Sequence, residues 1–274
     1  MNSPSIASSV REALLSRFLR YVAIDTESDP TSTTYPSTEK QLDLLRLLRD
    51  ELIELGVPEV RLLEKGYVMA QIPATPGYED RPALGLIAHA DTSPDFTGRG
   101  VRPQIIEDYD GSPIALGDTA VLTAREFPEL LELLGHTLIT TDGSTLLGAD
   151  DKAGVAEIME TVRYILAHPE LPHGKICIGF TPDEEIGKGV DFFDVKAFGA
   201  DFAFTVDGSR EGELEYENFN AASARVVAHG RSIHPGSAKG KMINALEAIY
   251  LLHAALPHYA RPEFTEGYEG FYHL

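Results

Sequence analysis

The chain has 274 residues, 43% hydrophobic and 24% charged, a balance that is typical of a globular protein and not of a disordered one. Its 43 acidic and 23 basic side chains give a net charge of −20, which disfavours nucleic acid as a partner because phosphates would be repelled. The single cysteine, Cys177, excludes an intrachain disulfide and a thiolate metal cluster, and it fits a reducing compartment.

The N-terminal residues show no export signal. Their apolar positions are interrupted by charged side chains, so the uninterrupted apolar stretch of a signal peptide is not formed. No apolar run elsewhere approaches the length of a membrane span. We therefore expect a cytoplasmic protein with no membrane partner.

The first part of the chain predicts two helices separated by a loop. Apolar residues recur at helical spacing over residues 9–24, which indicates an amphipathic helix. The polar stretch 25–37 contains two prolines and is predicted to be a loop. A second helix is expected over about 38–55, with Ser37 as its N-cap and Gly56 just beyond its end.

Strand and helix patterns then alternate along the chain. Short apolar runs predict strands at 83–89, 137–140, 176–180 and 202–206, and residues 152–167 repeat apolar side chains with a helical period. Continuously apolar strands suit burial on both faces of a sheet. The sequence therefore predicts an α/β fold with a mainly parallel sheet flanked by helices.

A second, smaller domain is expected after residue 217. The stretch 221–228 alternates apolar and polar residues, as a half-exposed strand would, and a helix is predicted over 242–256. We therefore divide the chain into a larger domain, 1–217, and part of a smaller α+β domain, 218–274.

Four polar clusters follow the predicted strands or lie in adjoining loops. They are "HAD" (89–91), "GADDKAG" (148–154), "DEE" (183–185) and "VDG" (206–208). Ligands of open parallel sheets bind beyond the carboxyl ends of the strands, so we expect all four clusters at one edge of the sheet.

The residue types of these clusters indicate a metal site. Histidine, aspartate and glutamate supply the nitrogen and oxygen ligands of zinc and related divalent ions. Crowded carboxylates repel one another unless cations lie between them, and two divalent ions about 3.5–4 Å apart would also activate a shared water. His89 and Asp91 are two residues apart, so on an extended chain both side chains lie on one face, and Asp91 is placed to orient the imidazole.

Each cluster taken alone also has an ordinary structural interpretation. A histidine and an aspartate two apart can be a surface pair, and Asp150 and Asp151 suit the first turn of a helix because acids are favourable there. Glu184 with Glu185 can form a solvated turn, and an aspartate before a glycine is common in turns. The metal hypothesis depends on the four clusters converging.

The order of these clusters resembles the co-catalytic zinc peptidase family that includes carboxypeptidase G, aminoacylase and peptidase T. Longer strings look like the peptidase T branch, the tripeptide aminopeptidases. These strings are "HADTSPDFTGRGVRP", "TLLGADDKAGVAEIM", "GFTPDEEIGKGV", "ENFNAA" and "IHPGSAKGKMINA", together with the N-terminal "FLRYVAIDTESD". The resemblance runs along the whole chain.

The resemblance implies a role for particular residues. His89 and Asp207 would bind the first zinc, Glu185 the second, and Asp150 would bridge both. Glu184 would be the general base that takes a proton from the bridging water and passes it to the leaving amine. The neighbouring Asp151 is not expected to be a ligand.

Further residues carry supporting roles by the same resemblance. Asp91 would support the first zinc ligand as part of the catalytic machinery. His234, in the smaller domain, would reach the substrate or the transition-state oxyanion, and Asn244 would help hold the peptide backbone. The implied enzyme releases the N-terminal residue of tripeptides, with small peptides as substrates and a possible homodimer as its assembly.

One metal ligand of the family has no match in this sequence. The second zinc also takes a histidine from near the C-terminus of the family's catalytic domain. His273 is not that residue, because its string "TEGYEGFYHL" resembles a mid-sequence segment. The chain is thus expected to be C-terminally truncated, with an incomplete second site and weak or no activity by itself.

Two alternatives to the tripeptide aminopeptidase stay open at this point. One is a deacylase or carboxypeptidase of the same family, against which the longer peptidase T strings count. The other is a non-catalytic remnant that binds peptide or a partner subunit. Zinc is favoured by the mixed nitrogen and oxygen ligands, although cobalt or manganese could occupy the same geometry.

Overall fold

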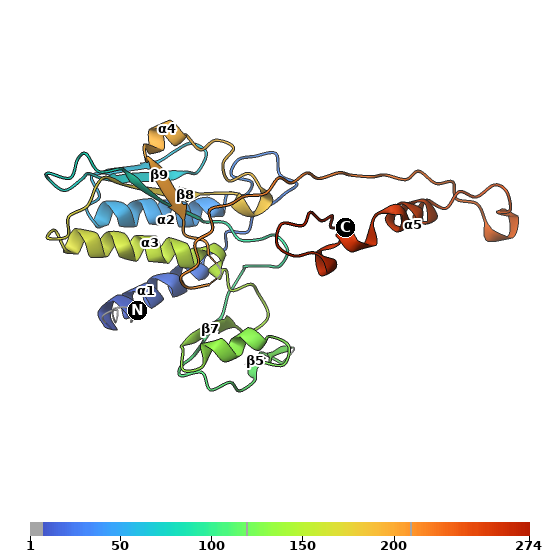
Figure 1. The fold of residues 1–274 in the computed structure, drawn as a ribbon, viewed down its shortest axis with the longest axis horizontal. Helices are drawn as coiled ribbons and strands as arrows, with labels where there is room; N and C mark the ends of the chain where they lie inside the picture. Colours follow the sequence, from blue (N-terminus) through green and yellow to red (C-terminus); the bar gives the residue numbers. More distant parts are fainter. Residues whose placement is uncertain (1–7, 119, 209) are drawn as a thin grey trace. The chain divides into compact units, whose positions relative to one another are not determined.

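The computed structural model describes residues 8–118, 120–208 and 210–274 of the chain (Figure 1). The chain divides into two compact units, Met1–Leu214 and Glu215–Leu274, and each is described by itself. None of the helices within the described ranges is both long and apolar enough to cross a membrane.

A five-stranded sheet forms the centre of the first unit. Its strand order is β1-β2-β8-β3-β9, with β1 at Glu59–Leu62, β2 at Val68–Ile72, β3 at Leu84–His89, β8 at Ile176–Thr181 and β9 at Phe202–Thr205. The pairs β8–β3 and β3–β9 are parallel, whereas β1–β2 and β2–β8 are antiparallel. The predicted α/β class is confirmed. Two strands that the sequence did not reveal, β1 and β2, extend one side of the sheet, and the sheet is mixed because β2 runs opposite to the other four strands.

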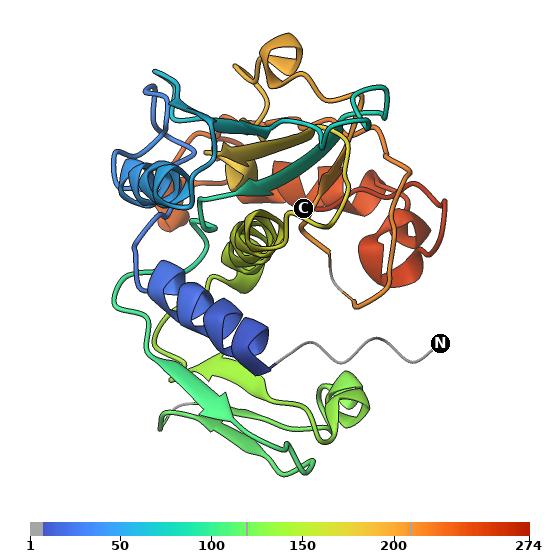
Figure 2. The same cartoon turned by 90° about the vertical axis from the view of Figure 1, so that its left-hand side faces the viewer.

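Helices cover both faces of this sheet. They are α1 at Ser8–Val22, α2 at Gln41–Glu54, α3 at Ala149–Ala167 and the short α4 at Val195–Phe198. In Figure 1, α2 and α3 lie below the sheet and α4 above it, and α1 packs on α3. The main core lies between the sheet and the lower helices, and it includes Leu44, Leu48, Val155, Met159, Ile178 and Phe180. Figure 2 shows the same layers end-on.

The second helix does not begin as the sequence predicted. α2 starts at Gln41, its N-cap residue is Lys40, and no side chain caps it. The predicted cap, Ser37, lies one turn earlier and gives its hydroxyl to the buried carboxylate of Asp183. The prediction was wrong because a buried carboxylate requires donors more strongly than a solvent-accessible helix end does.

Two predicted strands form, but the pairing of one and the exposure of the other differ from what the sequence predicted. The predicted strand at 137–140 forms as β7, Leu138–Thr141, but it pairs antiparallel with β4, Pro103–Ile106, outside the main sheet. A second small pair joins β5, Ile114–Leu116, to β6, Ala120–Leu122. The apolar run of β9 forms a strand at the edge of the sheet, beside β3, and it is exposed along its length.

The second unit contains one α-helix, α5 at Ala245–Ala255, as predicted. The expected strand at 221–228 is not present: the structure gives these residues no regular element. Alternation alone cannot make a strand, because a strand needs a partner for its backbone groups, and the described residues of this unit offer a single bridge, Arg231 with Ile243. The short 3₁₀ helices of the chain are η1 at Pro128–Leu133, η2 at Glu184–Ile186, η3 at Pro235–Ser237, η4 at His258–Ala260 and η5 at Pro262–Phe264.

Shortening a buried side chain on the central strand, β8, is expected to destabilise the first unit strongly. Ile178 on β8 is fully buried, so Ile178→Ala should lower the free energy of unfolding by about 2–5 kcal/mol. The matched control is Ile53→Ala on α2, where the side chain is 54% exposed and the change should stay within about 0.5 kcal/mol. Urea denaturation of both variants measures the difference, and equal losses would contradict this placement of the core.

Candidate metal centre

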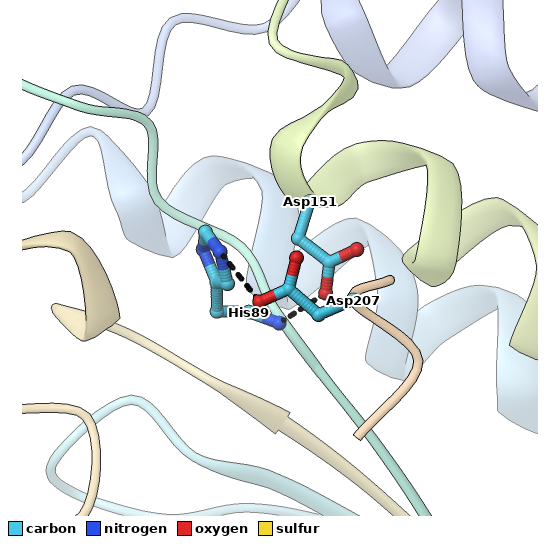
Figure 3. Close-up of side chains that lie close together, drawn as sticks. All are labelled: His89, Asp151 and Asp207. Carbon is cyan, nitrogen blue, oxygen red and sulfur yellow. Dashed lines mark hydrogen bonds and ion pairs between the residues drawn. The ribbon is translucent and has the colours of Figure 1, made fainter. Parts of the chain in front are cut away.

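His89 is the buried centre of a group of carboxylates. It ends β3, and its ring Nε2 lies 2.9 Å from an oxygen of Asp150, 3.7 Å from Asp207 and 3.8 Å from Glu184. These residues come from the start of α3 and from the loops that follow β9 and β8. The four polar clusters predicted from the sequence therefore meet at the carboxyl ends of the parallel strands. Figure 3 shows Asp207 and Asp151 approaching the histidine.

Asp91 connects the histidine to the two glutamates. Its carboxylate is fully buried and lies 3.3 Å from Nδ1 of His89, on the opposite side of the ring from Asp150. Its two oxygens also accept the backbone N–H groups of Glu184, at 3.0 Å, and Glu185, at 3.2 Å. The backbone carbonyl of Asp91 also lies 3.1 Å from Nδ1 of His89, so this one residue orients the imidazole and holds the backbone of the glutamate turn.

The start of α3 directs its two aspartates to different partners. Asp150 and Asp151 have non-helical backbone torsions, so the regular helix begins after them. The buried carboxylate of Asp151 accepts the backbone N–H groups of His89, at 3.1 Å, and Gly154, at 3.2 Å. Gly154 is required here because a Cβ atom would lie 1.8 Å from the carbonyl oxygen of Val206. Asp151 therefore ties the helix to the end of β3, while the carboxylate of Asp150 stays open to solvent.

Two overlapping groups of side chains have the spacing of a metal site. One consists of His89, Asp151 and Asp207, and the other of His89, Asp150 and Glu185, with the ligand atoms of each group within 4.8 Å of one another. The sequence did not predict Asp151 in this position. Each oxygen of Asp151 accepts one backbone N–H group, whereas the carboxylate of Asp150 is open to solvent.

The charges at the centre suit a cation. Burial, together with the charge of Asp150, raises the pKa of Glu185 to about 7, and burial together with Asp207 raises the pKa of Asp151 to about 8. Burial also raises the pKa of Glu184 and of Asp207. Each of these carboxyls is costly to ionise where it lies. Divalent cations would remove that cost, and one imidazole nitrogen with several carboxylates is a donor set that zinc accepts.

The pH dependence of stability in chelator follows from these shifts. Because the pKa values of Glu185 and Asp151 are raised from 4.5 and 3.8 to about 7 and 8, the folded chain binds more protons than the unfolded chain between these values. The free energy of unfolding should therefore fall as the pH rises through this window. Urea denaturation in chelator at pH 5 and pH 8 tests the sign. Higher stability at pH 8 would contradict it.

The two remaining predicted residues lie in the second unit. Nδ1 of His234 accepts the N–H of Gly236 at the start of η3, and Asn244 caps α5 by accepting the N–H of Leu246 at 3.1 Å. Both side chains are exposed, so His234 is not a buried structural histidine. Their predicted roles towards substrate stay predictions.

A separate cavity of about 950 Å³ lies between α1, α3 and the strands β4 and β7. Its lining includes Phe18, Ile139 and Ala153, and none of the candidate metal ligands is among its lining residues. The lining also contains titratable side chains, including Glu107, Asp108 and His136, but only at His89 does one buried imidazole have three carboxylates at 2.9–3.8 Å among the described residues, so His89 is the candidate site.

Comparison with known proteins relates both units to peptidases. Residues 216–273 match the family model described as a peptidase dimerisation domain. Over 265 residues the chain is 57% identical to peptidase T of Clostridium acetobutylicum, and over 264 residues it is 58% identical to peptidase T of Desulfitobacterium hafniense. Each match covers 96% of this chain and 65% or 64% of the relative, so the chain spans just under two thirds of the relatives' length.

Solved structures support the fold. The chain aligns with the aminopeptidase PepT of Bacillus cereus at a TM-score of 0.55 and 22% identity, covering 90% of this chain and 57% of that one. It aligns with a tripeptidase of Staphylococcus aureus at a TM-score of 0.58 and 21% identity, covering 93% and 58%. The resemblance to peptidase T that the motifs indicated is confirmed by the curated relatives.

Proposed function

We propose, from its similarity to peptidase T, that the chain carries the metal-binding centre of an aminopeptidase that removes the N-terminal residue of tripeptides. The observation that supports this most is the meeting of four separate loops at His89. His89, Asp150 and Asp207 would hold one zinc ion, and Asp150 with Glu185 would contribute to a second. Each of these side chains has a ligand atom close to the imidazole or to another member of the group.

The proposed reaction divides the work among the residues of this centre. When bound, zinc would make a water molecule acidic near neutral pH and polarise the scissile carbonyl. Glu184 would take the proton of that water and deliver it to the leaving amine, and its raised pKa suits a group that both accepts and donates a proton. Asp91 would keep His89 in one orientation and the glutamate turn in place.

The second unit would add substrate contacts and an assembly surface. We propose that His234 stabilises the oxyanion of the transition state and that Asn244 contacts the peptide backbone. The match of residues 216–273 to a peptidase dimerisation domain supports a homodimer. The cytoplasmic location expected from the sequence stays a prediction.

A substrate panel tests the reaction. The turnover of the purified chain with zinc should be weak, and it should consist of release of the N-terminal residue of free tripeptides, with N-acylated peptides and acyl amino acids left intact. Release of the acyl group, or of a C-terminal residue, would instead support the deacylase or carboxypeptidase alternative. The expectation of weak turnover by this polypeptide would be overturned by robust hydrolysis with zinc at both sites.

Zinc content and turnover, measured together, test whether the chain is an enzyme or a non-catalytic remnant that binds peptide. If the chain binds zinc and turns over tripeptides, the aminopeptidase proposal stands. If it binds zinc and peptide without turnover above the buffer rate, this polypeptide is not catalytic by itself, as the expected incomplete second zinc site also predicts. If zinc does not bind, the metal centre itself is wrong. Cobalt and manganese in parallel titrations identify which ion the centre prefers.

A further inference from the structure

Asp183 immediately precedes the two glutamates of the site, but it does not cap the turn that carries them. It occupies the N-cap position of η2 without a side-chain cap hydrogen bond. Asp194, at the same position of α4, caps in the ordinary way by accepting the N–H of Ala197 at 2.9 Å. At η2 the first N–H groups go to Asp91 instead. The usual reason for an aspartate before a helical turn is therefore absent.

The carboxylate of Asp183 is held by residues from the other end of the chain. It is fully buried, and it accepts the backbone N–H of Ser37 at 2.7 Å, the hydroxyl of Ser37, and the side-chain amide of Gln41 at 2.7 Å. The backbone N–H of Asp183 in turn donates to the amide oxygen of Gln41 at 3.1 Å. These partners are more than 140 residues away in sequence, so the contacts connect the glutamate turn to the start of α2.

The backbone at this position would favour a different residue. Asp183 has a φ of 58°, in the left-handed region where glycine costs least. Glycine at this position would lack the hydrogen bonds that the Asp183 side chain makes to Ser37 and Gln41.

The far end of the same loop is anchored to the same region. The hydroxyl of Tyr35 donates to the carbonyl of Lys188 at 2.6 Å, and the N–H of Lys188 donates to the carbonyl of Asp183 at 2.9 Å. The segment before α2 also binds the chain just after Asp91, where the N–H of Ser28 donates to the carbonyl of Thr92 at 3.1 Å. Residues 26–41 thus hold both loops whose side chains meet at His89.

We propose that Asp183 is a positioning residue, which fixes the backbone of Glu184 and Glu185 by binding Ser37 and Gln41. The roles of the two glutamates in metal binding and proton transfer rest on the proposed function. The placement of their backbone does not, because it depends on contacts among protein atoms alone. The two claims can therefore be tested separately in one set of variants.

Asp183→Asn is the most direct variant. Three donors bind the carboxylate of Asp183, one at one oxygen and two at the other. Asparagine has a single side-chain oxygen, so it can accept hydrogen bonds only from the donors on one of these two sides. Its NH₂ group would then face a donor, the N–H of Ser37 or the pair formed by the Ser37 hydroxyl and Gln41. The side chain keeps its size, so what is lost is the fixation of the turn.

Hydrogen exchange and zinc titration measure the effect in the 274-residue chain. In Asp183→Asn the amide hydrogens of Glu184 and Glu185 should exchange at least about tenfold faster, because the turn that holds them against Asp91 is loosened. Zinc affinity should fall by about 10–100-fold, the range typical for partners that orient metal ligands. Ser37→Ala removes one of the three donors and should shift both measurements in the same direction by a smaller factor.

The matched control is Glu51→Gln on α2. Glu51 is another buried carboxylate with several donors, from Arg17, Arg20 and Tyr21, and it has no recorded hydrogen bond to the glutamate turn. Its replacement should lower overall stability but leave exchange at Glu184 and Glu185, and zinc affinity, within about twofold.

Unchanged exchange at the two glutamates in Asp183→Asn would overturn the inference, as would an equal effect of Glu51→Gln. If Asp183→Asn does not fold, Ser37→Ala decides alone, and unaltered exchange in that variant overturns it. If the unaltered chain binds no zinc, the proposed function fails, while the exchange measurement still decides the role of Asp183.

Discussion

Glu184→Gln is expected to lower the rate of tripeptide hydrolysis by about 10²–10⁴-fold while zinc binding stays unchanged, because general acid–base groups contribute that much to rate. Glutamine has nearly the same shape and keeps the backbone N–H that Asp91 accepts, but it cannot take a proton. Glu184 is outside both groups of side chains with metal-site spacing. Release of the N-terminal residue at saturating zinc gives the rate, and elemental analysis gives the zinc content.

The neighbouring glutamate provides the sharpest comparison. Glu185 has a ligand atom in one of the groups around His89, so the main effect expected of Glu185→Gln is a loss of bound zinc. Glu54→Gln, at an exposed position of α2, should change neither rate nor zinc content. If Glu184→Gln lost zinc, or if it kept half of the original rate, the assignment of proton transfer to Glu184 would be wrong.

The meeting of the four polar clusters at His89 was largely predictable because it depends on strand ends. His89, Glu184 and Asp207 each follow an apolar run, and a parallel arrangement of β3, β8 and β9 brings the ends of those runs together. The period-two spacing of His89 and Asp91 placed both side chains on one side of the chain, as the structure has them. These patterns involve residues that are close to one another in the sequence, so they can be recognised in a single sequence.

What the sequence could not predict depends on contacts between distant residues. The loop before α2 looked like a polar connection, yet Ser37 and Gln41 bind a carboxylate more than 140 residues away. The proximity of Asp151 to His89 has the same origin, because its carboxylate reaches the backbone at the end of β3. Neither contact leaves a periodicity in the sequence.

The wrong expectations about strands have a related cause. An apolar run predicted burial for β9, but strand side chains are buried only where other elements cover the faces of the sheet, and all four residues of β9 are exposed at the edge beside β3. The alternation at 221–228 met no partner strand in its unit. Apolar content and alternation indicate that a segment can form a strand, whereas its neighbours determine whether the strand forms and whether it is buried.

The second large effect is expected at His89, which belongs to both groups with metal-site spacing and is their one nitrogen donor. His89→Ala should weaken zinc binding by at least about 100-fold, since loss of a supporting partner alone costs about 10–100-fold. Isothermal titration with zinc measures the change. His168→Ala is the control, because that histidine lies on the surface beside Glu170 and should not affect zinc.

Folding must be separated from binding in this variant, because His89 is buried and hydrogen-bonds the acids around it. Burial alone would lower its pKa, but hydrogen bonds to Asp150 and Asp91 raise it to about 11, which favours an imidazolium among these acids in chelator. His89→Ala should therefore also lower stability in chelator. Asp207 belongs to only one of the two groups with metal-site spacing. Asp207→Asn should therefore weaken zinc binding while keeping that imidazolium. If both variants bound zinc as tightly as the unaltered chain, the metal would have to lie elsewhere, and the four loops that meet at His89 would need another explanation.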